Sequence, residues 1–318
     1  MADATAERIV IAVLTYKRPD DIVTALTALD RQESGDHRRV EILVIDNDPL
    51  ASAQTTVESL GLGHIRYVHE PKAGIAAARN RALAESADVP LLIFVDDDET
   101  PSENWLRSLL ATYDLTRPTA VVGPVISEFP FEPDEWMRGG RFFDRRRMPT
   151  GTVVTAAATN NLLLDLDQLR TMNLSFDERY GLSGGSDTLF TRQIVLAGGR
   201  MVWCDEAVVV DRVPADRMSR DWVLRRAFRS GNSWSRTNLE LSSGLARAVV
   251  RAKSTLQGLV RLGGGATQVG LGVVSGNIAH RARGTRTVAR GAGLIAGAFG
   301  HVYSEYRRSP STEAEPTP

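Results

Sequence analysis

The sequence predicts an α/β fold in which a mostly parallel, Rossmann-like sheet is sandwiched by helices and followed by a C-terminal helical extension. Three observations predict it. Apolar runs of strand length alternate with helical patterns through the first half of the chain. The run over residues 91–95 is continuously apolar, as in strands that are covered on both faces. From residue 241 onward the chain becomes rich in Gly, Ala and Val with scattered arginines, which sets this part apart.

The first half supplies the βαβ units. The expected strands are Ile9–Leu14, Val40–Ile45, Ile65–His69, Leu91–Val95 and Ala120–Val125, and the expected helices are Pro19–Arg31, Gly74–Ala87 and Glu103–Leu115. Pro19 suits the first turn of a helix, because an N–H at that position would have no partner inside the helix. Strands and helices that alternate in this way form right-handed crossovers and a parallel sheet, whose ligands bind at the carboxyl ends of the strands.

The second half is less regular. Residues 129–151 combine Pro, Gly and aromatic residues with three consecutive arginines, and they predict a long loop that acts as a lid or an acceptor platform. A returning strand is expected at Thr152–Asp165, followed by a glycine-rich loop over 181–187. The remaining expected elements are the helix Thr188–Ala197, the strands Met201–Trp203 and Ala207–Val210, and the arginine-rich helix Arg220–Arg236.

Positive charge is concentrated in the C-terminal part. The net charge is −1, yet 17 Lys and Arg stand against 4 Asp and Glu between Arg212 and Arg308. Residues 241–308 predict a basic helical extension, in which glycines interrupt Gly263–Ile278 and the better helix is Ala289–Tyr306. Such helices lie on a membrane surface, dock on the globular domain or pair in a homo-oligomer. Residues 309–318 are polar and predict a disordered tail.

Composition argues against several classes of protein. A single cysteine, Cys204, leaves neither an intrachain disulfide nor a cysteine-cluster zinc site. Residues 1–8 are polar and do not resemble a signal peptide, and no run of about twenty apolar residues predicts a membrane span. No nucleic-acid-binding module is recognisable. The expected location is the cytoplasm, with peripheral contact at the inner face of the cell membrane through the extension as one of the alternatives above.

The apolar run at 91–95 ends in three adjacent carboxylates, Asp96, Asp97 and Asp98. Neighbouring anions repel one another and resist burial, so they need a cation. Carboxylate oxygens suit Mg²⁺ or Mn²⁺, and such an ion typically carries substrate phosphates as well. The run therefore predicts a metal-bridged phosphate ligand at the carboxyl end of the sheet. The alternative is a solvated acidic turn that stops at Pro101.

Five motifs in order resemble family 2 glycosyltransferases with the GT-A fold: Ile11–Pro19, Val44–Asn47, Gly74–Asn80, Phe94–Asp98 and Gly184–Phe190. The resemblance covers residues 8–236. It implies an inverting enzyme that moves a hexose from a nucleotide-diphospho-sugar, expected to be UDP-linked, to a hydroxyl of a glycan or lipid-linked glycan, with Mg²⁺ or Mn²⁺. It further implies a catalytic domain over residues 1–240, with a nucleotide-sugar half at about 8–125 and an acceptor half at about 126–240.

By the same resemblance, the residues that contact the donor nucleotide are Thr15, Tyr16, Arg18, Asp46, Lys72, Arg79, Asp96 and Asp97, and the metal ligands are Asp96 and Asp98. Thr15 and Tyr16 also fit plain β propensity. Asp46 would accept a hydrogen bond from the uracil imide, or else belong to a turn. Arg79 would hold the diphosphate or pair with the acidic run, unless it is a solvated helix arginine.

Asp187 is the expected catalytic base, because a carboxylate within hydrogen-bond reach can take the proton of an acceptor hydroxyl. Alternatively, Asp187 or Ser186 caps the following helix. The expected acceptor or diphosphate contacts are Asn160, Ser186, Arg225 and Arg229, where the two arginines share a helix face or are simply solvated. The family often has Glu-Asp where this chain has Ser186-Asp187, and a metal-ligating histidine near Asp211. These departures leave open a non-catalytic nucleotide-sugar-binding or assembly protein on the same scaffold.

Overall fold

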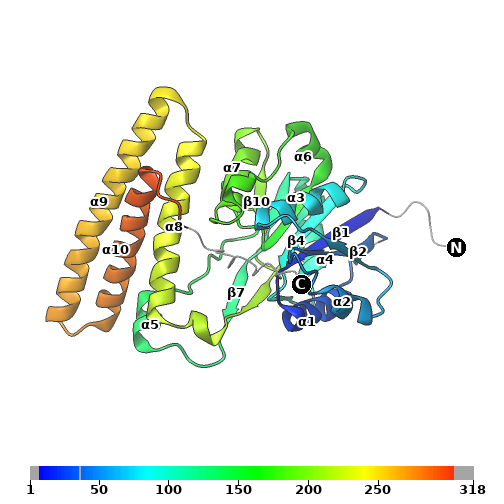
Figure 1. The fold of residues 1–318 in the computed structure, drawn as a ribbon, viewed down its shortest axis with the longest axis horizontal. Coiled ribbons are helices and arrows are strands. Elements are labelled where there is room, and N and C mark those ends of the chain that lie inside the picture. The colour runs from blue at the N-terminus through cyan, green and yellow to red at the C-terminus, as the bar shows by residue number, and fades with distance from the viewer. Residues whose placement is uncertain (1–6, 36, 304–318) are drawn as a thin grey trace, which may run out of the picture.

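The computed structural model describes residues 7–35 and 37–303 of the chain. It shows an α/β body beside a layer of long helices at the C-terminal end (Figure 1). The predicted tail 309–318 lies outside the described residues, as do the last residues of the expected helix Ala289–Tyr306. The functional residues predicted from the sequence all fall within the described part.

Within the described residues, eight strands form one sheet in the order β3-β2-β1-β4-β9-β6-β10-β8. β3, β2, β1 and β4 are parallel, whereas β9 runs antiparallel between β4 and β6, and β8 runs antiparallel to β10. The predicted mostly parallel sheet is therefore confirmed. The strands are β1 Arg8–Thr15, β2 Arg39–Asp46, β3 Ile65–His69, β4 Leu91–Asp96, β6 Ala120–Val122, β8 Val153–Val154, β9 Asn161–Asp165 and β10 Met201–Trp203.

Helices cover both faces of this sheet (Figure 1). One face carries α1 (Pro19–Asp30), α2 (Gln54–Ser59) and α4 (Trp105–Thr116), and the other carries α3 (Ile75–Glu85), α6 (Leu166–Met172) and α7 (Ser186–Leu196). Successive residues of β1 alternate between the two cores: Ile11 packs into the first and Ala12 into the second. Because both faces are covered, the central parts of β1 and β4, residues 9–14 and 91–95, are apolar at every position.

A second sheet of three strands lies at the carboxyl edge, in the order β5-β11-β7. Its strands are β5 Glu99–Pro101, β7 Val125–Glu128 and β11 Val209–Arg212. The expected strand Ala120–Val125 is divided between the two sheets, and the expected strand Thr152–Asp165 is two short strands with a loop between them. Since β5 follows the acidic run directly, Asp97 and Glu99 are buried. A solvated acidic turn is thus the wrong reading of this segment.

The segment 129–151, expected to be a loop, contains helix α5 (Glu135–Gly140). The side chain of Asp134 caps it by accepting a hydrogen bond from the backbone N–H of Met137. Trp136 and Met137 pack in a third apolar cluster with Val223 of α8 (Arg220–Glu240). The part of the chain that the structure describes also contains two short 3₁₀ helices, Glu178–Tyr180 and Ala215–Arg217. The segment is therefore anchored on α8 instead of being a free lid.

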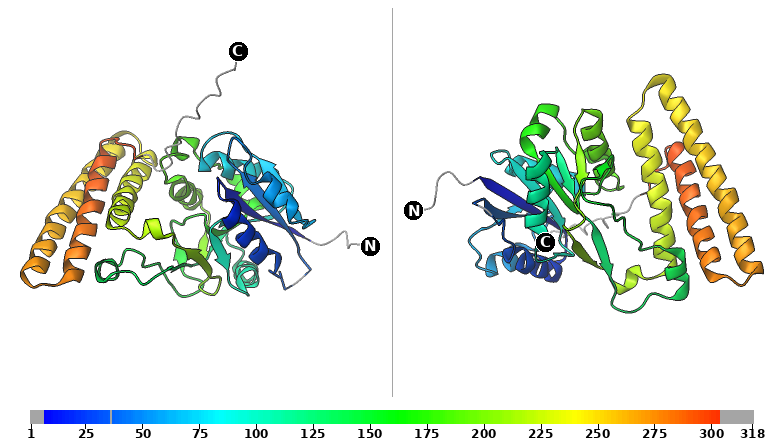
Figure 2. Two further views of the ribbon diagram at one scale, coloured as in Figure 1. Left: turned by 60° about the horizontal axis from the view of Figure 1, so that its bottom comes forward. Right: turned by 180° about the vertical axis from the view of Figure 1, so that it is seen from behind.

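Two further helices, α9 (Gly244–Val274) and α10 (Ile278–Ala298), form an antiparallel hairpin beside α8 (Figures 1 and 2). Within 263–278, where glycines were expected to break the helix, α9 continues through its glycines to Val274, and the break comes at the turn that contains Gly276. Gly258, Gly265 and Gly272 lie one heptad apart against α10, and a Cβ on Gly265 would sit 2.8 Å from the carbonyl oxygen of Gly284. Close packing of the two backbones offsets the roughly 1 kcal/mol that each glycine costs a helix.

Among residues 7–35 and 37–303, none of the helices combines the length and the apolar character that a bilayer crossing requires.

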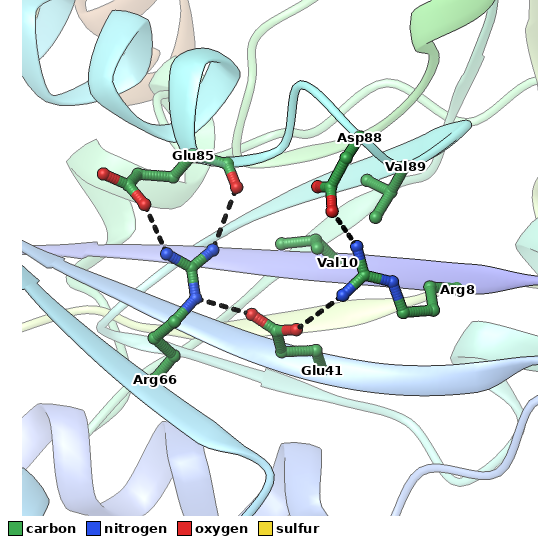
Figure 3. Close-up of a pocket in the computed structure, with 7 residues that line it drawn as sticks. All are labelled: Arg8, Val10, Glu41, Arg66, Glu85, Asp88 and Val89. Atoms are coloured by element: carbon green, nitrogen blue, oxygen red, sulfur yellow. Dashed lines mark hydrogen bonds and ion pairs between the residues drawn. The ribbon is translucent and has the colours of Figure 1, made fainter.

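The amino ends of the parallel strands carry a group of ion pairs that we call the amino-edge network: Arg8, Glu41, Arg66, Glu85 and Asp88 (Figure 3). Arg8 of β1 pairs with Asp88 and with Glu41, and Arg66 of β3 pairs with Glu41 at 2.7 Å and with Glu85. A cavity of about 320 Å³ lies among these side chains. Each arginine has carboxylates on two sides, and Arg81 also pairs with Glu85, so three arginines offset the three carboxylates.

Candidate active site

A cavity of about 970 Å³ opens at the opposite edge, where the carboxyl ends of β1 and β4 meet. The register explains the meeting, since Leu14 at the end of β1 lies beside Asp96 at the end of β4. α7 and α8 supply further walls. The predicted site residues that line this cavity are Thr15, Tyr16, Arg18, Arg79, Asp96, Asp97, Asp98, Asn160, Ser186, Asp187 and Arg229.

The floor of the cavity is acidic. Arg18 Nη1 donates to Asp97 Oδ1 at 2.9 Å and to Asp98 Oδ2 at 2.8 Å, and Arg217 Nη1 lies 3.5 Å from Asp98 Oδ2. Burial nevertheless raises the pKa of Asp96 to about 7, with the neighbouring Asp98 adding to the shift. Burial also raises the pKa of Asp97 to about 6, against the opposing effect of Arg18. Arg18 and Arg217 therefore do not fully offset the negative charge of the three carboxylates that form the floor, Asp96, Asp97 and Asp98.

Glu99 shows the same imbalance, because burial and the nearby Asp96 raise its pKa well above the usual range. Its Oε1 accepts a hydrogen bond from Asn160 Nδ2 at 2.7 Å, which ties this predicted acceptor contact to the floor. The floor consists of buried carboxylates whose negative charge is not fully offset, which is the first indication that a cationic group binds here.

The donor set fits Mg²⁺ or Mn²⁺. Asp96 and Asp98 offer hard carboxylate oxygens on the floor of the cavity. Mg²⁺ is commonly held by one or two carboxylates together with substrate phosphates. In the described part of the chain no three His, Cys, Asp or Glu side chains are grouped to hold a metal by themselves. Asp211, near which the family often has a metal-ligating histidine, pairs with Arg145. A metal at this site would need ligands from the substrate.

Asp187 lies in the first turn of α7. The helix begins at Ser186 and its N-cap is Gly185, so the prediction that Asp187 or Ser186 caps the helix is wrong. Gly185 has a φ of 94°, and a Cβ there would lie 3.2 Å from that of Ser233 on α8. Only glycine suits this tight turn, which brings Asp187 to the cavity.

Arg79 connects α3 to the start of α7. The residue is buried, and its Nη1 donates to Ser186 Oγ at 2.7 Å. Its guanidinium also lies over the ring of Phe176, 5.5 Å from the centroid. The solvated-arginine alternative is thereby wrong. Arg79 holds the segment that carries Asp187 while its charge opposes the pKa rise of Asp96.

A wall of arginines faces the acidic floor. It consists of Arg145, Arg217, Arg226, Arg229 and Arg290. Burial lowers the pKa of Arg226 to about 9, and the repulsion of Arg145 and Arg229 adds to the shift. The guanidinium of Arg226 lies 5.4 Å from the centroid of the Trp222 ring. Cations that are held together against their own repulsion indicate a site for an anion.

Of the two arginines predicted on this helix, Arg229 lines the cavity and Arg225 does not. Arg225 is exposed, pairs with Asp221 one turn earlier and does not line the cavity, whereas Arg226 and Arg229 do. One residue rotates a side chain by about 100° around a helix, so only the packing of α8 decides which arginines face inward. The apolar residues Val223 and Ala227 are buried, and their spacing was the signal in the sequence for the face of α8 that turns inward.

Two other predicted residues lie outside the cavity. Asp46 is fully buried, and it accepts hydrogen bonds from the N–H groups of Asp48 and Ala53 and from the hydroxyl of Tyr67, each at 2.9 Å. Its carboxylate holds the loop after β2, as the turn alternative has it, and the contact with a base stays a prediction. Lys72 pairs with Glu178 at the surface. Asn47, which follows Asp46, lines the cavity instead.

Comparison with known proteins adds two findings. A family model described as Glycosyl transferase family 2 matches residues 10–166. Over 241 residues the chain is 36% identical to the succinoglycan biosynthesis protein ExoM of Rhizobium meliloti (strain 1021), a match that spans 75% of this chain and 77% of that protein.

Solved structures share the architecture. The mannosyltransferase PcManGT from Pyrobaculum calidifontis, in complex with GDP-Man and Mn²⁺, superposes with a TM-score of 0.59 at 17% identity, covering 92% of this chain and 88% of that one. S. aureus TarS 1-349 in complex with UDP-GlcNAc gives a TM-score of 0.52 at 16% identity, covering 89% of this chain and 90% of that one. At such identities the likeness concerns the fold alone.

Proposed function

The chain belongs to glycosyltransferase family 2 and has the GT-A fold, and from this premise we propose that it is an inverting hexosyltransferase. The donor is a nucleotide-diphospho-sugar, with UDP as the expected nucleotide. The acceptor is a hydroxyl of a glycan or lipid-linked glycan. The observation that carries the proposal is the meeting, in one cavity, of a charge-deficient carboxylate floor, an arginine wall and Asp187.

Donor binding is assigned to the strand ends. Thr15 and Tyr16 line the part of the cavity at the end of β1, where a nucleoside would lie across the carboxyl edge. Arg18 already contacts the acidic floor and can follow a diphosphate placed there. Bound at Asp96 and Asp98, Mg²⁺ or Mn²⁺ would supply a Lewis-acid charge for the departing diphosphate. The solved relatives that bind GDP-Man with Mn²⁺ and UDP-GlcNAc support this assignment.

Asp187 is assigned as the general base. An acceptor hydroxyl is a weak nucleophile at neutral pH, and a carboxylate that takes its proton as it attacks removes this obstacle. The acceptor oxygen forms a bond to C1 of the sugar while the bond from C1 to the diphosphate oxygen breaks on the opposite face. The proton passes to Asp187, and the electron pair of the broken bond leaves with the nucleoside diphosphate. The anomeric configuration is therefore inverted.

The arginine wall and Asn160 are assigned to the acceptor side. Arg226 and Arg229 face the cavity from α8, across from the strand ends that are assigned to the donor. A phosphate of the acceptor or the diphosphate of the donor would relieve the repulsion among these cations. The 36% identical relative is a succinoglycan biosynthesis protein, which favours an acceptor in polysaccharide biosynthesis. A lipid-linked acceptor would place the enzyme at the cytoplasmic face of the cell membrane.

The test uses the purified full chain with Mn²⁺ and a panel of nucleotide sugars. Donor binding is followed by thermal shift, because a ligand that binds only the folded state raises the melting temperature. Turnover is followed by release of the nucleoside diphosphate with and without glycan acceptors. Asp187→Asn and Asp98→Asn serve as site variants. Glu85→Gln in the amino-edge network is the matched control, since it also removes one carboxylate charge.

We expect binding and turnover by the wild type and by Glu85→Gln, binding without turnover by Asp187→Asn, and weakened binding by Asp98→Asn. A wild type that binds a donor but never releases the diphosphate would assign the chain to the alternative, a non-catalytic nucleotide-sugar-binding or assembly protein. A wild type that binds no sugar nucleotide would overturn both readings.

A further inference from the structure

Helix α9 has two faces with different side chains. Gly258, Gly265 and Gly272 form the face that packs against α10. The opposite face carries large apolar residues at helical spacing, which we call the outer stripe: Leu245, Val249, Leu256, Val260, Leu271 and Val274. At about 100° per residue, these six fall on one side of the helix, turned away from the glycines. The helix is therefore apolar on the side that its own chain leaves uncovered.

Every residue of the outer stripe is between 59% and 89% exposed. α9 lies at the edge of the molecule, on the far side of α10 from the sheet (Figures 1 and 2). No described residue of this chain packs on the stripe. Single exposed leucines are ordinary on a protein surface, but six large exposed apolar residues on one side of a 31-residue helix mark a surface that meets something.

The charge of the hairpin selects the partner. The segment 241–304 contains no Asp or Glu, and α9 and α10 together carry eight cations: Arg247, Arg251, Lys253, Arg261, Arg281, Arg283, Arg286 and Arg290. Lys253 is exposed and lies at the edge of the stripe, whereas the exposed Arg247 and Arg251 lie on other sides of α9. A second copy of the hairpin would bring like charges together, which disfavours a dimer through this face. An apolar face on a hairpin whose charged side chains are all cations matches the interface of an anionic bilayer.

We propose that the outer stripe of α9 lies in the surface of an anionic phospholipid membrane, with the helix parallel to the bilayer plane. Leu and Val side chains enter the headgroup boundary, Lys253 at the edge of the stripe contacts lipid phosphates, and the other cations of α9 add attraction to the anionic surface. α10 and α8 then lie between the membrane and the cavity, so the cavity stands off the bilayer by two helix spacings of roughly 8–10 Å each. This inference goes beyond the proposed transfer reaction and does not depend on it.

The test is flotation of the purified full chain with vesicles of phosphatidylcholine that contain phosphatidylglycerol, and with vesicles of phosphatidylcholine alone. The test variant is the double substitution Leu256→Glu and Val260→Glu. The matched control is Leu115→Glu with Leu196→Glu, which places the same charges on exposed apolar positions of α4 and α7. Thermal melts of all variants report folding, gel filtration reports the oligomeric state, and donor binding is measured on the same samples.

We expect the wild type and the control to float with the anionic vesicles, and the stripe variant to bind at least about tenfold less with an unchanged melt. Failure of the wild type to bind anionic vesicles overturns the inference, as does an equal loss in the stripe variant and the control. A dimer that the stripe variant dissolves, without vesicle binding by the wild type, assigns the stripe to a second copy and overturns it too. Donor binding separates these results from a failure of the proposed function.

Discussion

The two ends of the same parallel strands carry charged groups of opposite character. In the amino-edge network the partners lower the pKa of Glu85 and raise that of Arg66, so each group is more stable charged than it would be in water. At the carboxyl edge, burial raises the pKa of Asp96 to about 7 and lowers that of Arg226 to about 9. The comparison shows that a cluster of charged residues does not by itself indicate a ligand-binding site. Such a site is indicated where charges around a cavity are disfavoured by their surroundings in the fold.

The two edges also differ in what they join. Arg66 reaches from β3 to Glu41 of β2 and Glu85 of α3, so the amino-edge network links neighbouring elements (Figure 3). Its side chains are partly exposed, and water screening keeps the contribution of each pair to stability small. At the carboxyl edge an acidic floor and a basic wall line one cavity, and they touch where Arg217 lies 3.5 Å from Asp98. The substitutions below separate a structural role from a functional one.

The largest effect is expected for Asp187→Asn. Loss of the general base should lower the rate of sugar transfer by about 10²- to 10⁴-fold, because the amide cannot take the acceptor proton. Donor binding and the melting temperature should change little, since Asp187 is not the N-cap of α7. Steady-state assays of transfer, with thermal shift on the same samples, check both. Near wild-type turnover would remove Asp187 from the role of base.

Asp98→Asn should have the next largest effect. In the presence of Mn²⁺ the donor affinity should fall about tenfold or more, which is about 1.4 kcal/mol of binding free energy. Removal of the ion with a chelator should weaken donor binding by the wild type to a similar extent. Isothermal titration calorimetry with and without the ion measures both. Donor affinity that depends on neither Asp98 nor the ion would contradict the assignment of the floor.

Arg226→Met should separate binding from stability. Its charge is disfavoured in the fold, so its removal should leave the free energy of unfolding unchanged or slightly higher. The KM for an anionic acceptor or donor should rise about tenfold, as expected when a hydrogen bond to a charged group is lost. Arg225→Met is the matched control and should change neither quantity, because Arg225 is exposed. Equal effects of the two substitutions would exclude a specific role for Arg226.

Glu85→Gln at the opposite edge should have the smallest effect. The free energy of unfolding should fall by about 1 kcal/mol at neutral pH, with no change in transfer rate. Because Arg66 lowers the folded-state pKa of Glu85 below its ordinary value of 4.5, this stability is present above that value and is lost as the pH falls through the lowered pKa. Urea unfolding at neutral and acidic pH checks this. A difference between the two proteins that grows in acid would contradict it.

The sequence predicted those strands and helices that are determined by residues close together in the chain. The apolar runs gave the positions of β1, β2, β3 and β4, and the polar residues that follow them located the cavity. α5 escaped prediction because the contacts that stabilise its six residues come from α8 and α10, far along the chain. The glycines of α9 were misjudged for the same reason, since only the partner helix turns them from breakers into contact points.

The site residues divide in the same way. Asp98 and Asp187 follow a strand and a glycine turn, so their positions are determined by the adjacent chain. Asp46 and Arg225 do not line the cavity, whereas their neighbours Asn47 and Arg226 do. The direction of a turn and the rotation of a helix decide which of two neighbours faces the cavity, and neither can be read from the local sequence. Arg290 reaches the cavity from α10, far along the chain from the last motif, which ends at Phe190, and no local signal pointed to it.

The most direct test of the central claim is hydrogen exchange measured with Mn²⁺ and UDP, and with Mn²⁺ and GDP, against the free protein. The account predicts that one nucleotide slows exchange around residues 15–18, 96–99 and 184–188 and leaves the strand starts of the amino-edge network unchanged. Protection at the amino edge, or at neither edge with either nucleotide, would contradict the claim that the charge-deficient cavity is the nucleotide-sugar site.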